Sequence, residues 1–161
     1  MLSDIVSKNG NLLLSVPVRG DGTIDEKEEA IVEQIASWTQ RNGEAIFTTR
    51  PWRKFGEGPT KPPPPGMFSE DKLKPFTAED IRFTRKGNAL YAIFLDWPQA
   101  DSAIQSLGSN ALPGAVIERV DLLGGPQLQF RRDAEALRVT LPPPADGAFV
   151  PALRINGRGL V

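Results

Sequence analysis

Two hydrophobic patterns divide the chain. Up to residue 43, a short apolar run precedes an amphipathic helical stripe, whereas from residue 76 short period-two stretches alternate with turn residues. The first arrangement is typical of a β/α unit and the second of an antiparallel β-sandwich. The sequence therefore predicts a mainly β chain with a β/α unit within residues 1–50, a Pro/Gly-rich linker over 51–75 and a sandwich over 76–161.

The apolar run near the start predicts a buried strand. Residues 11–16 read NLLLSV without alternation and are followed by Pro17 and the turn-rich sequence RGDG at 19–22. Such a run fits a parallel strand covered on both faces, which needs neighbouring strands and helices. One β/α unit cannot supply them, so we expect residues 1–50 to be loosely held and the segment from about residue 76 to be the protease-resistant core.

The next segment predicts a helix that ends near Gly43. Thr23 and Glu26 have the spacing of a capping box, and acidic residues crowd the first turns. The apolar stripe has the i, i+4, i+7 spacing of one helix face and consists of Ile31, Ile35 and Trp38.

Residues 51–75 are rich in proline and glycine. Pro62–Pro65 favour polyproline II, so the segment is interpreted as a linker or surface loop. Binding of an SH3-type partner by this run is the alternative, and nothing else in the sequence supports it.

The remaining chain predicts the sandwich. Gly87-Asn88 separates two alternating stretches, as in a tight hairpin. Pro151 within the last stretch favours an edge strand or a bulge. Further short strands are expected at 103–107, 115–123, 127–131, 136–141 and 148–155.

Composition limits the chemistry. The 161 residues carry a net charge of −1, which offers no basic excess for nucleic acid, and no apolar stretch is long enough to cross a membrane. The first ten residues lack the pattern of a signal peptide. The chain has no cysteine and no histidine, which excludes Ser–His triads, thiolate nucleophiles and histidine- or thiolate-bound metals within it. We expect no metal site and no cofactor.

Several ordered blocks carry a resemblance. They are DIVSKNGNLLLSV at 4–16, DGTI at 21–24, GEAI at 43–46, RPW at 50–52, EDIRFTRKGNALYAIFLDWP at 79–98, VDLLG at 120–124 and LRVTLP at 137–142. In this order and spacing they resemble the C-terminal part of the α-L-fucosidase family of retaining glycoside hydrolases. The sequence departs from the family pattern at Ser15, where Asn is usual, and at Pro17-Val18, which puts loop shape and fine specificity in doubt.

The resemblance implies a fragment of a two-domain enzyme. In the family a (β/α)8-like catalytic barrel precedes a β-sandwich, and the first unit here resembles the last β/α unit of that barrel. Both catalytic carboxylates would then lie upstream of Met1, which would be an internal methionine or a mistaken start. The missing barrel segment would be an intramolecular partner, the substrate a fucosylated glycan or glycoside, and the parent secreted, periplasmic or lysosomal.

Without the two catalytic carboxylates, the resemblance implies that this chain cannot hydrolyse a glycoside. A retaining glycosidase needs a nucleophilic carboxylate and a proton donor about 5–5.5 Å apart. The resemblance places no catalytic residue in this chain, so we expect no hydrolysis by the chain alone. Asn11, Ser15 and Arg19 lie nearest the expected mouth of the active site and are candidate substrate-binding residues, although we favour strand-end hydrogen bonding and an exposed loop charge as their roles.

A non-catalytic carbohydrate-binding or interaction sandwich is the alternative function. Trp52, Phe55, Tyr91 and Trp97 are candidates for a sugar-stacking platform. We favour core positions for Tyr91, which lies in an apolar stretch, and for Trp38 on the helix stripe.

Overall fold

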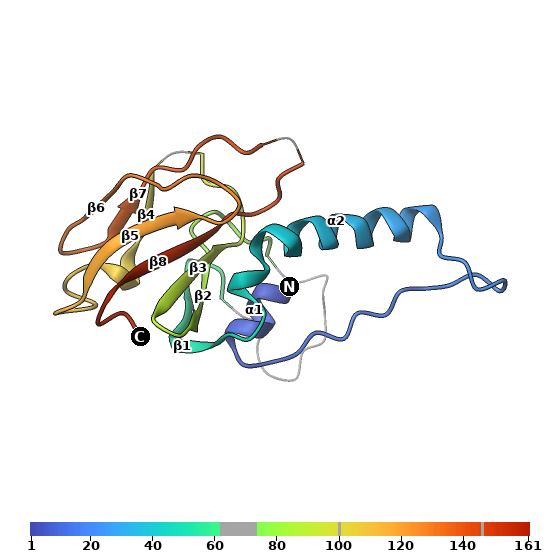
Figure 1. Ribbon diagram of the computed structural model, residues 1–161, viewed down its shortest axis with the longest axis horizontal. Coiled ribbons are helices and arrows are strands. Elements are labelled where there is room, and N and C mark those ends of the chain that lie inside the picture. Colours follow the sequence, from blue (N-terminus) through green and yellow to red (C-terminus); the bar gives the residue numbers. More distant parts are fainter. Residues whose placement is uncertain (62–73, 100, 146) are drawn as a thin grey trace.

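The fold is a two-sheet β-sandwich with a projecting arm, which consists of the extended segment 10–25 and helix α2 (Glu26–Asn42) (Figure 1). The computed structural model describes residues 1–61, 74–99, 101–145 and 147–161. The larger sheet has five strands in the order β1-β2-β3-β8-β5, and the smaller has three in the order β4-β7-β6. The paired strands are antiparallel: β1 (Arg50–Glu57), β2 (Ile81–Lys86), β3 (Ala89–Phe94), β4 (Ser102–Ile104), β5 (Val116–Leu122), β6 (Phe130–Arg132), β7 (Leu137–Val139) and β8 (Ala152–Arg158).

The main core lies between the two sheets. Phe83, Leu90 and Leu153 of the larger sheet and Leu137 of the smaller sheet are completely buried in it. Trp52 packs edge-on against Phe83 with ring centroids 5.1 Å apart. This arrangement confirms the predicted mainly β sandwich.

A second apolar cluster covers the outer face of the larger sheet. Tyr91, Ile93 and Ala152 point to this side and meet the 3₁₀ turn at Gly43–Ala45. Leu2 and Val6 of helix α1 (Leu2–Ser7) pack against the same cluster. Strand β3 is buried along its whole length because both of its faces are covered.

Helix α1 is anchored to the sandwich. Asp4 accepts a hydrogen bond from Nε of Arg82 in β2, whose side chain is 6% exposed, and also pairs with Lys8 at 2.8 Å. The expectation that all of residues 1–50 are loosely held is therefore wrong for this helix, because a short amphipathic turn and a mostly buried ion pair attach it to the sheet.

The predicted strand at residues 11–16 is not formed. The segment is extended but unpaired, Leu13 is 95% exposed, and the only nearby β-bridge joins Val18 to Ile24. A strand needs partners for its backbone N–H and C=O groups, and no described strand lies beside this one. The front of the predicted β/α unit thus adopts an extended conformation.

Helix α2 (Glu26–Asn42) ends at the predicted position but begins with a different cap. Asp25, not Thr23, occupies the N-cap and accepts a hydrogen bond from the Lys27 N–H at 3.0 Å. Thr23 is already engaged with Asp21, to which its N–H and hydroxyl both donate. The capping-box prediction is therefore wrong in its residues.

Strand β1 lies inside the predicted linker. It pairs with β2 and buries Trp52, whose indole N–H donates to the Leu160 carbonyl at 2.6 Å. The prediction of a linker from residue 51 is thus wrong up to Glu57, where the chain is an edge strand with few buried side chains. The proline run at 62–65 lies outside the described residues.

The later strands agree with the pattern except at the last one. The Gly87-Asn88 hairpin is confirmed, with Lys86 paired to Ala89 across it. Strand β8 is an interior strand between β3 and β5, not an edge strand. Pro151 is tolerated because it precedes the strand and contributes only its carbonyl, which accepts from the Phe94 N–H at 3.0 Å.

Candidate functional site

The predicted substrate-binding residues lie on the arm that projects from the sandwich (Figure 1). Asn11, Ser15 and Arg19 are all exposed and belong to the extended segment before α2. The guanidinium of Arg19 pairs with Asp25 at 3.1 Å, and its backbone closes a tight turn with Thr23. The structure places the three residues along one extended segment, where each of them is exposed.

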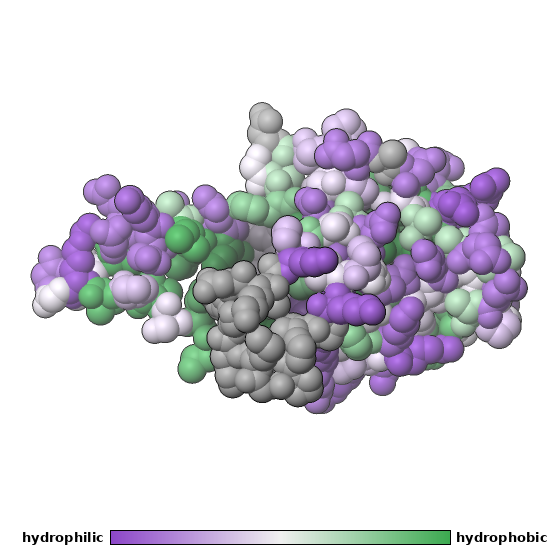
Figure 2. All heavy atoms as spheres, turned by 180° about the vertical axis from the view of Figure 1, so that it is seen from behind, coloured by the Kyte–Doolittle hydropathy of each residue, from purple (hydrophilic) through white to green (hydrophobic). Residues whose placement is uncertain are grey.

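The arm carries an unusual amount of exposed apolar surface. Figure 2 shows apolar side chains at the surface of this projecting part. Leu13, Leu14, Val18 and Ile24 of the extended segment and Ile31, Val32 and Ile35 of α2 are each at least 36% exposed. So many large apolar side chains left exposed on two neighbouring segments of the chain favour an interaction site.

Four carboxyl groups in the described part of the chain have a displaced pKa, which is lowered in every case: Asp4, Asp21, Asp80 and Asp133. A hydrogen bond from Arg138, together with two backbone N–H donors, lowers the pKa of Asp133 to about 2. A glycosidase proton donor needs a raised pKa. The environment of Asp133 favours the opposite, a carboxylate that is ionised at neutral pH.

Asp80 has a structural role. Burial would raise the pKa of its carboxyl group, but the N–H and hydroxyl groups of Thr77 and Thr60 donate to it and outweigh burial, so that its pKa is lowered. Its oxygens accept from the Thr60 N–H at 3.0 Å and the Thr77 N–H at 2.8 Å. Asp80 thereby joins the two ends of the segment between β1 and β2.

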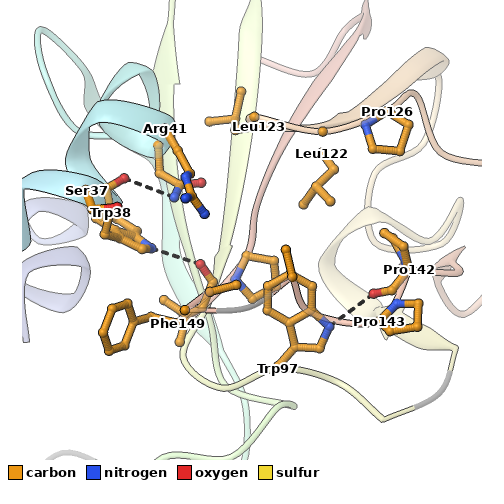
Figure 3. A pocket seen from close by; sticks show the side chains of 18 residues that line it. Ser37, Trp38, Arg41, Trp97, Leu122, Leu123, Pro126, Pro142, Pro143 and Phe149 are labelled. Atoms are coloured by element: carbon orange, nitrogen blue, oxygen red, sulfur yellow. Dashed lines mark hydrogen bonds between the residues drawn. The ribbon is translucent and has the colours of Figure 1, made fainter. Parts of the chain in front are cut away.

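A cavity of about 270 Å³ lies where the C-terminal half of α2 meets the sandwich (Figure 3). Its walls come from α2, the β5–β6 turn, the loop after β3 and the segment leading into β8. In the view of Figure 3, Trp38 and Arg41 extend from α2 at the left, Phe149 and Trp97 lie below them, and Leu122 lies across from the helix.

The two indoles of this cavity are held by hydrogen bonds. Trp38 donates to the Val150 carbonyl at 2.9 Å, and Trp97 donates to the Pro142 carbonyl at 3.2 Å. Both carbonyls belong to the segment between β7 and β8, so these bonds also tie that segment to α2 and to the loop after β3.

The predicted four-residue aromatic platform is not present. Trp52 and Tyr91 are buried in the two cores, as predicted for Tyr91, and Phe55 lies beneath the cationic groups of Lys8 and Arg82. Only Trp97 reaches the cavity. Sequence reasoning missed Phe149 and Arg41, which no local motif distinguishes.

Two further features bear on function. The described residues contain no group of three His, Cys, Asp or Glu side chains that could hold a metal ion. No helix in the described ranges combines the length and apolar character needed to cross a bilayer.

Two family profiles match this chain and show to which protein family it belongs. The sequence profile of the α-L-fucosidase C-terminal domain matches residues 74–156, and the α-L-fucosidase profile matches residues 1–44. The chain belongs to the α-L-fucosidase family. The match over residues 1–44 covers α1, the extended segment and the whole of α2, and the other match covers most of the sandwich.

Curated and solved relatives agree. The rat tissue α-L-fucosidase is 29% identical over 150 residues, 92% of this chain and 28% of its own length. The plasma α-L-fucosidase of Pongo abelii is 34% identical over 126 residues, 76% of this chain and 22% of its own. A Thermotoga maritima α-fucosidase in complex with a mechanism-based inhibitor superposes with a TM-score of 0.67 at 30% identity, covering 95% of this chain and 32% of that one.

The similarity covers a C-terminal portion of an α-L-fucosidase. The chain spans less than one third of the length of these three relatives, too little to hold a complete catalytic domain. The predicted family and sandwich are confirmed.

Proposed function

We propose that this chain provides the last β/α unit and the buttressing β-sandwich of an α-L-fucosidase that removes α-L-fucose from glycans or glycosides. Alone it has no hydrolase activity. The remainder of the barrel is its intramolecular partner and supplies the nucleophilic Asp and the acid/base Glu. The exposed apolar surface of the arm is the observation that carries this proposal.

The arm is suited to completing a barrel. Residues 11–16 have backbone groups that pair with no described strand, and Ile31 and Ile35 of α2 are 49% and 39% exposed beside Leu2 and Phe149. Neighbouring barrel strands would satisfy those backbone groups and cover the leucines, and adjacent helices would cover Ile31 and Ile35. The same two elements fall within the match to the α-L-fucosidase profile.

In this proposal Ser15 and Arg19 take positions near the mouth of the complete active site, whereas Asn11 begins the apolar run at its opposite end. The C-terminal ends of barrel strands carry the active site, and Ser15 and Arg19 follow the Leu12–Leu14 run at that end. The hydroxyl of Ser15 and the guanidinium of Arg19 are suited to binding sugar hydroxyls.

The test is turnover of an aryl α-L-fucoside by the purified 161-residue protein. We expect no release of the aryl group above that of a mock purification from cells carrying an empty vector. Sustained turnover that follows the protein through a second purification step would overturn the proposal, because it requires a carboxylate pair within this chain.

A further inference from the structure

We propose that the cavity between α2 and the sandwich binds a single pyranose unit of a glycan at a non-catalytic site. This function is additional to completing the barrel. The cavity brings together residues from segments more than a hundred positions apart, namely the end of α2 and the approach to β8. Its aromatic walls, the guanidinium of Arg41 and its size together specify the ligand class.

The aromatic walls are preorganised. The indole N–H groups of Trp38 and Trp97 are bonded to backbone carbonyls, so the ring orientations are set before any ligand arrives. Phe149 is 49% exposed beside them. Aromatic faces are electron-rich, and the weakly positive C–H groups on one face of a pyranose ring pack favourably against them.

The adjoining backbone is stiff because proline is frequent in it. Pro126, Pro142, Pro143 and Pro151 line the cavity, and each fixes its own φ. A site with fixed walls loses little conformational entropy when it binds a ligand.

Arg41 supplies the polar contacts. Figure 3 shows its side chain directed into the cavity, and it makes no ion pair or side-chain hydrogen bond with the described residues. Gly124 has a φ of +70°, and a Cβ placed there would lie 3.3 Å from Cβ of Arg41. The glycine turn thus lies against the arginine stem and leaves the five guanidinium donors for ligand oxygens.

The size of the cavity favours one sugar ring. Sites for drug-sized ligands occupy roughly 300–1,000 Å³, and this cavity of about 270 Å³ lies just below that range. A purely apolar ligand would leave Arg41 unused, and a small anion would leave the aromatic walls empty. A pyranose presents a C–H face and a hydroxyl edge and matches both.

The experiment uses ¹⁵N-labelled full chain and follows the indole N–H signals of the three tryptophans. L-fucose, D-galactose and D-glucuronate are titrated separately, which distinguishes neutral sugars from a carboxylate sugar. We expect at least one sugar to shift the Trp97 and Trp38 signals saturably with a Kd of about 1 mM, typical of a weak site. The Trp52 signal should not move, because that ring is buried in the sandwich core.

Variants test whether the cavity is responsible. Trp97→Ala removes the aromatic wall and Arg41→Gln removes the charge, and each should weaken binding about tenfold or more. Phe47→Ala is the matched control, because Phe47 is 58% exposed and lies outside the cavity. An unchanged Trp52 signal in each variant verifies the fold.

Three results would overturn the proposal. No saturable shift with any of the three sugars rules out the site, as does unchanged affinity in the Trp97→Ala protein. An equal loss in the Phe47→Ala protein shows non-specific contact with exposed aromatics.

Discussion

Arg132 joins the two ends of the segment between η3 (Gln105–Leu107) and β5, and its replacement by methionine should be strongly destabilising. Its Nε donates to the Leu107 carbonyl at 2.7 Å, and Nη2 donates to the Leu112 carbonyl at 2.6 Å and weakly to Gly108 at 3.3 Å. Nη1 donates to the carbonyl of Ala115. The guanidinium group of Arg132 thus supplies hydrogen-bond donors to the backbone carbonyls of a loop that has little regular secondary structure.

The expected loss in the free energy of unfolding follows from the number of strong hydrogen bonds that Arg132 makes. Hydrogen bonds to a charged group contribute about 1.5–3 kcal/mol each, and a buried carbonyl left unpaired costs about 1–3 kcal/mol. Three of the four bonds to Arg132 are short, and Leu107, Leu112 and Ala115 are buried. Methionine retains much of the apolar stem, so packing changes little. Water can reach part of the exposed loop and replace some of these hydrogen bonds. We therefore expect the Arg132→Met protein to lose about 3–5 kcal/mol of its free energy of unfolding.

Urea unfolding followed by tryptophan fluorescence measures this loss, with an unchanged slope showing that the same surface unfolds. The Arg132→Lys protein is the matched control. Its compact ammonium group retains the charge but cannot reach three separate carbonyls, so it should recover less than half of the loss. If the methionine variant lies within about 1 kcal/mol of the parent, a level ordinary for surface changes, the loop is held by other contacts and this account is wrong.

Three further predictions concern charge, mobility and the apolar arm. The pKa of Asp133 is about 2, below the ordinary value of about 3.9. Its contribution to stability is therefore complete above about pH 4 and is lost as the pH falls towards 2. The urea midpoint should fall over this pH range, and it should fall less in the Asp133→Asn protein. Limited trypsin digestion should cut first at Arg19 and leave β2–β8 intact, whereas early cuts within the sandwich would contradict the structure. Replacing Ile31 and Ile35 by serine should lower binding of a hydrophobic dye while changing the free energy of unfolding by about 0.5 kcal/mol or less; a larger loss would mean that the two side chains are already packed.

The sandwich was largely predictable because local and tertiary preferences agree there. Gly87-Asn88 predicts a tight hairpin, and the flanking residues pair in the expected register. Strand β1 was missed because it is an edge strand in which only Trp52 and Gly56 are buried, so alternation is absent. Its proline and basic residues instead resemble a loop composition.

The helix cap shows how a turn decides between two suitable residues. Thr23 and Asp25 are both good N-cap types. Asp21 accepts both the N–H and the hydroxyl of Thr23, which leaves Asp25 to cap α2. The capping-box rule considers residues from the cap onwards and does not include this competition.

The candidate sugar site could not be predicted from local patterns. Arg41 and Phe149 are far apart in the sequence and have no motif in common. They meet because Trp38 bonds to Val150 and thereby fixes the segment before β8 against α2. Only the tertiary fold reveals such a site.

Two apolar runs of this chain have opposite fates, and the difference identifies what the arm lacks. Leu12–Leu14 and the strand Ala89–Phe94 are both continuous runs that predict burial on two faces. Strand β3 lies between β2 and β8 and is buried throughout, whereas the first run has no paired neighbour and exposes Leu13 almost completely. The pattern therefore specifies an environment, and the neighbouring strands determine whether the chain provides it. For residues 11–16 we propose that this environment is the set of adjacent parallel strands in the barrel of a complete α-L-fucosidase.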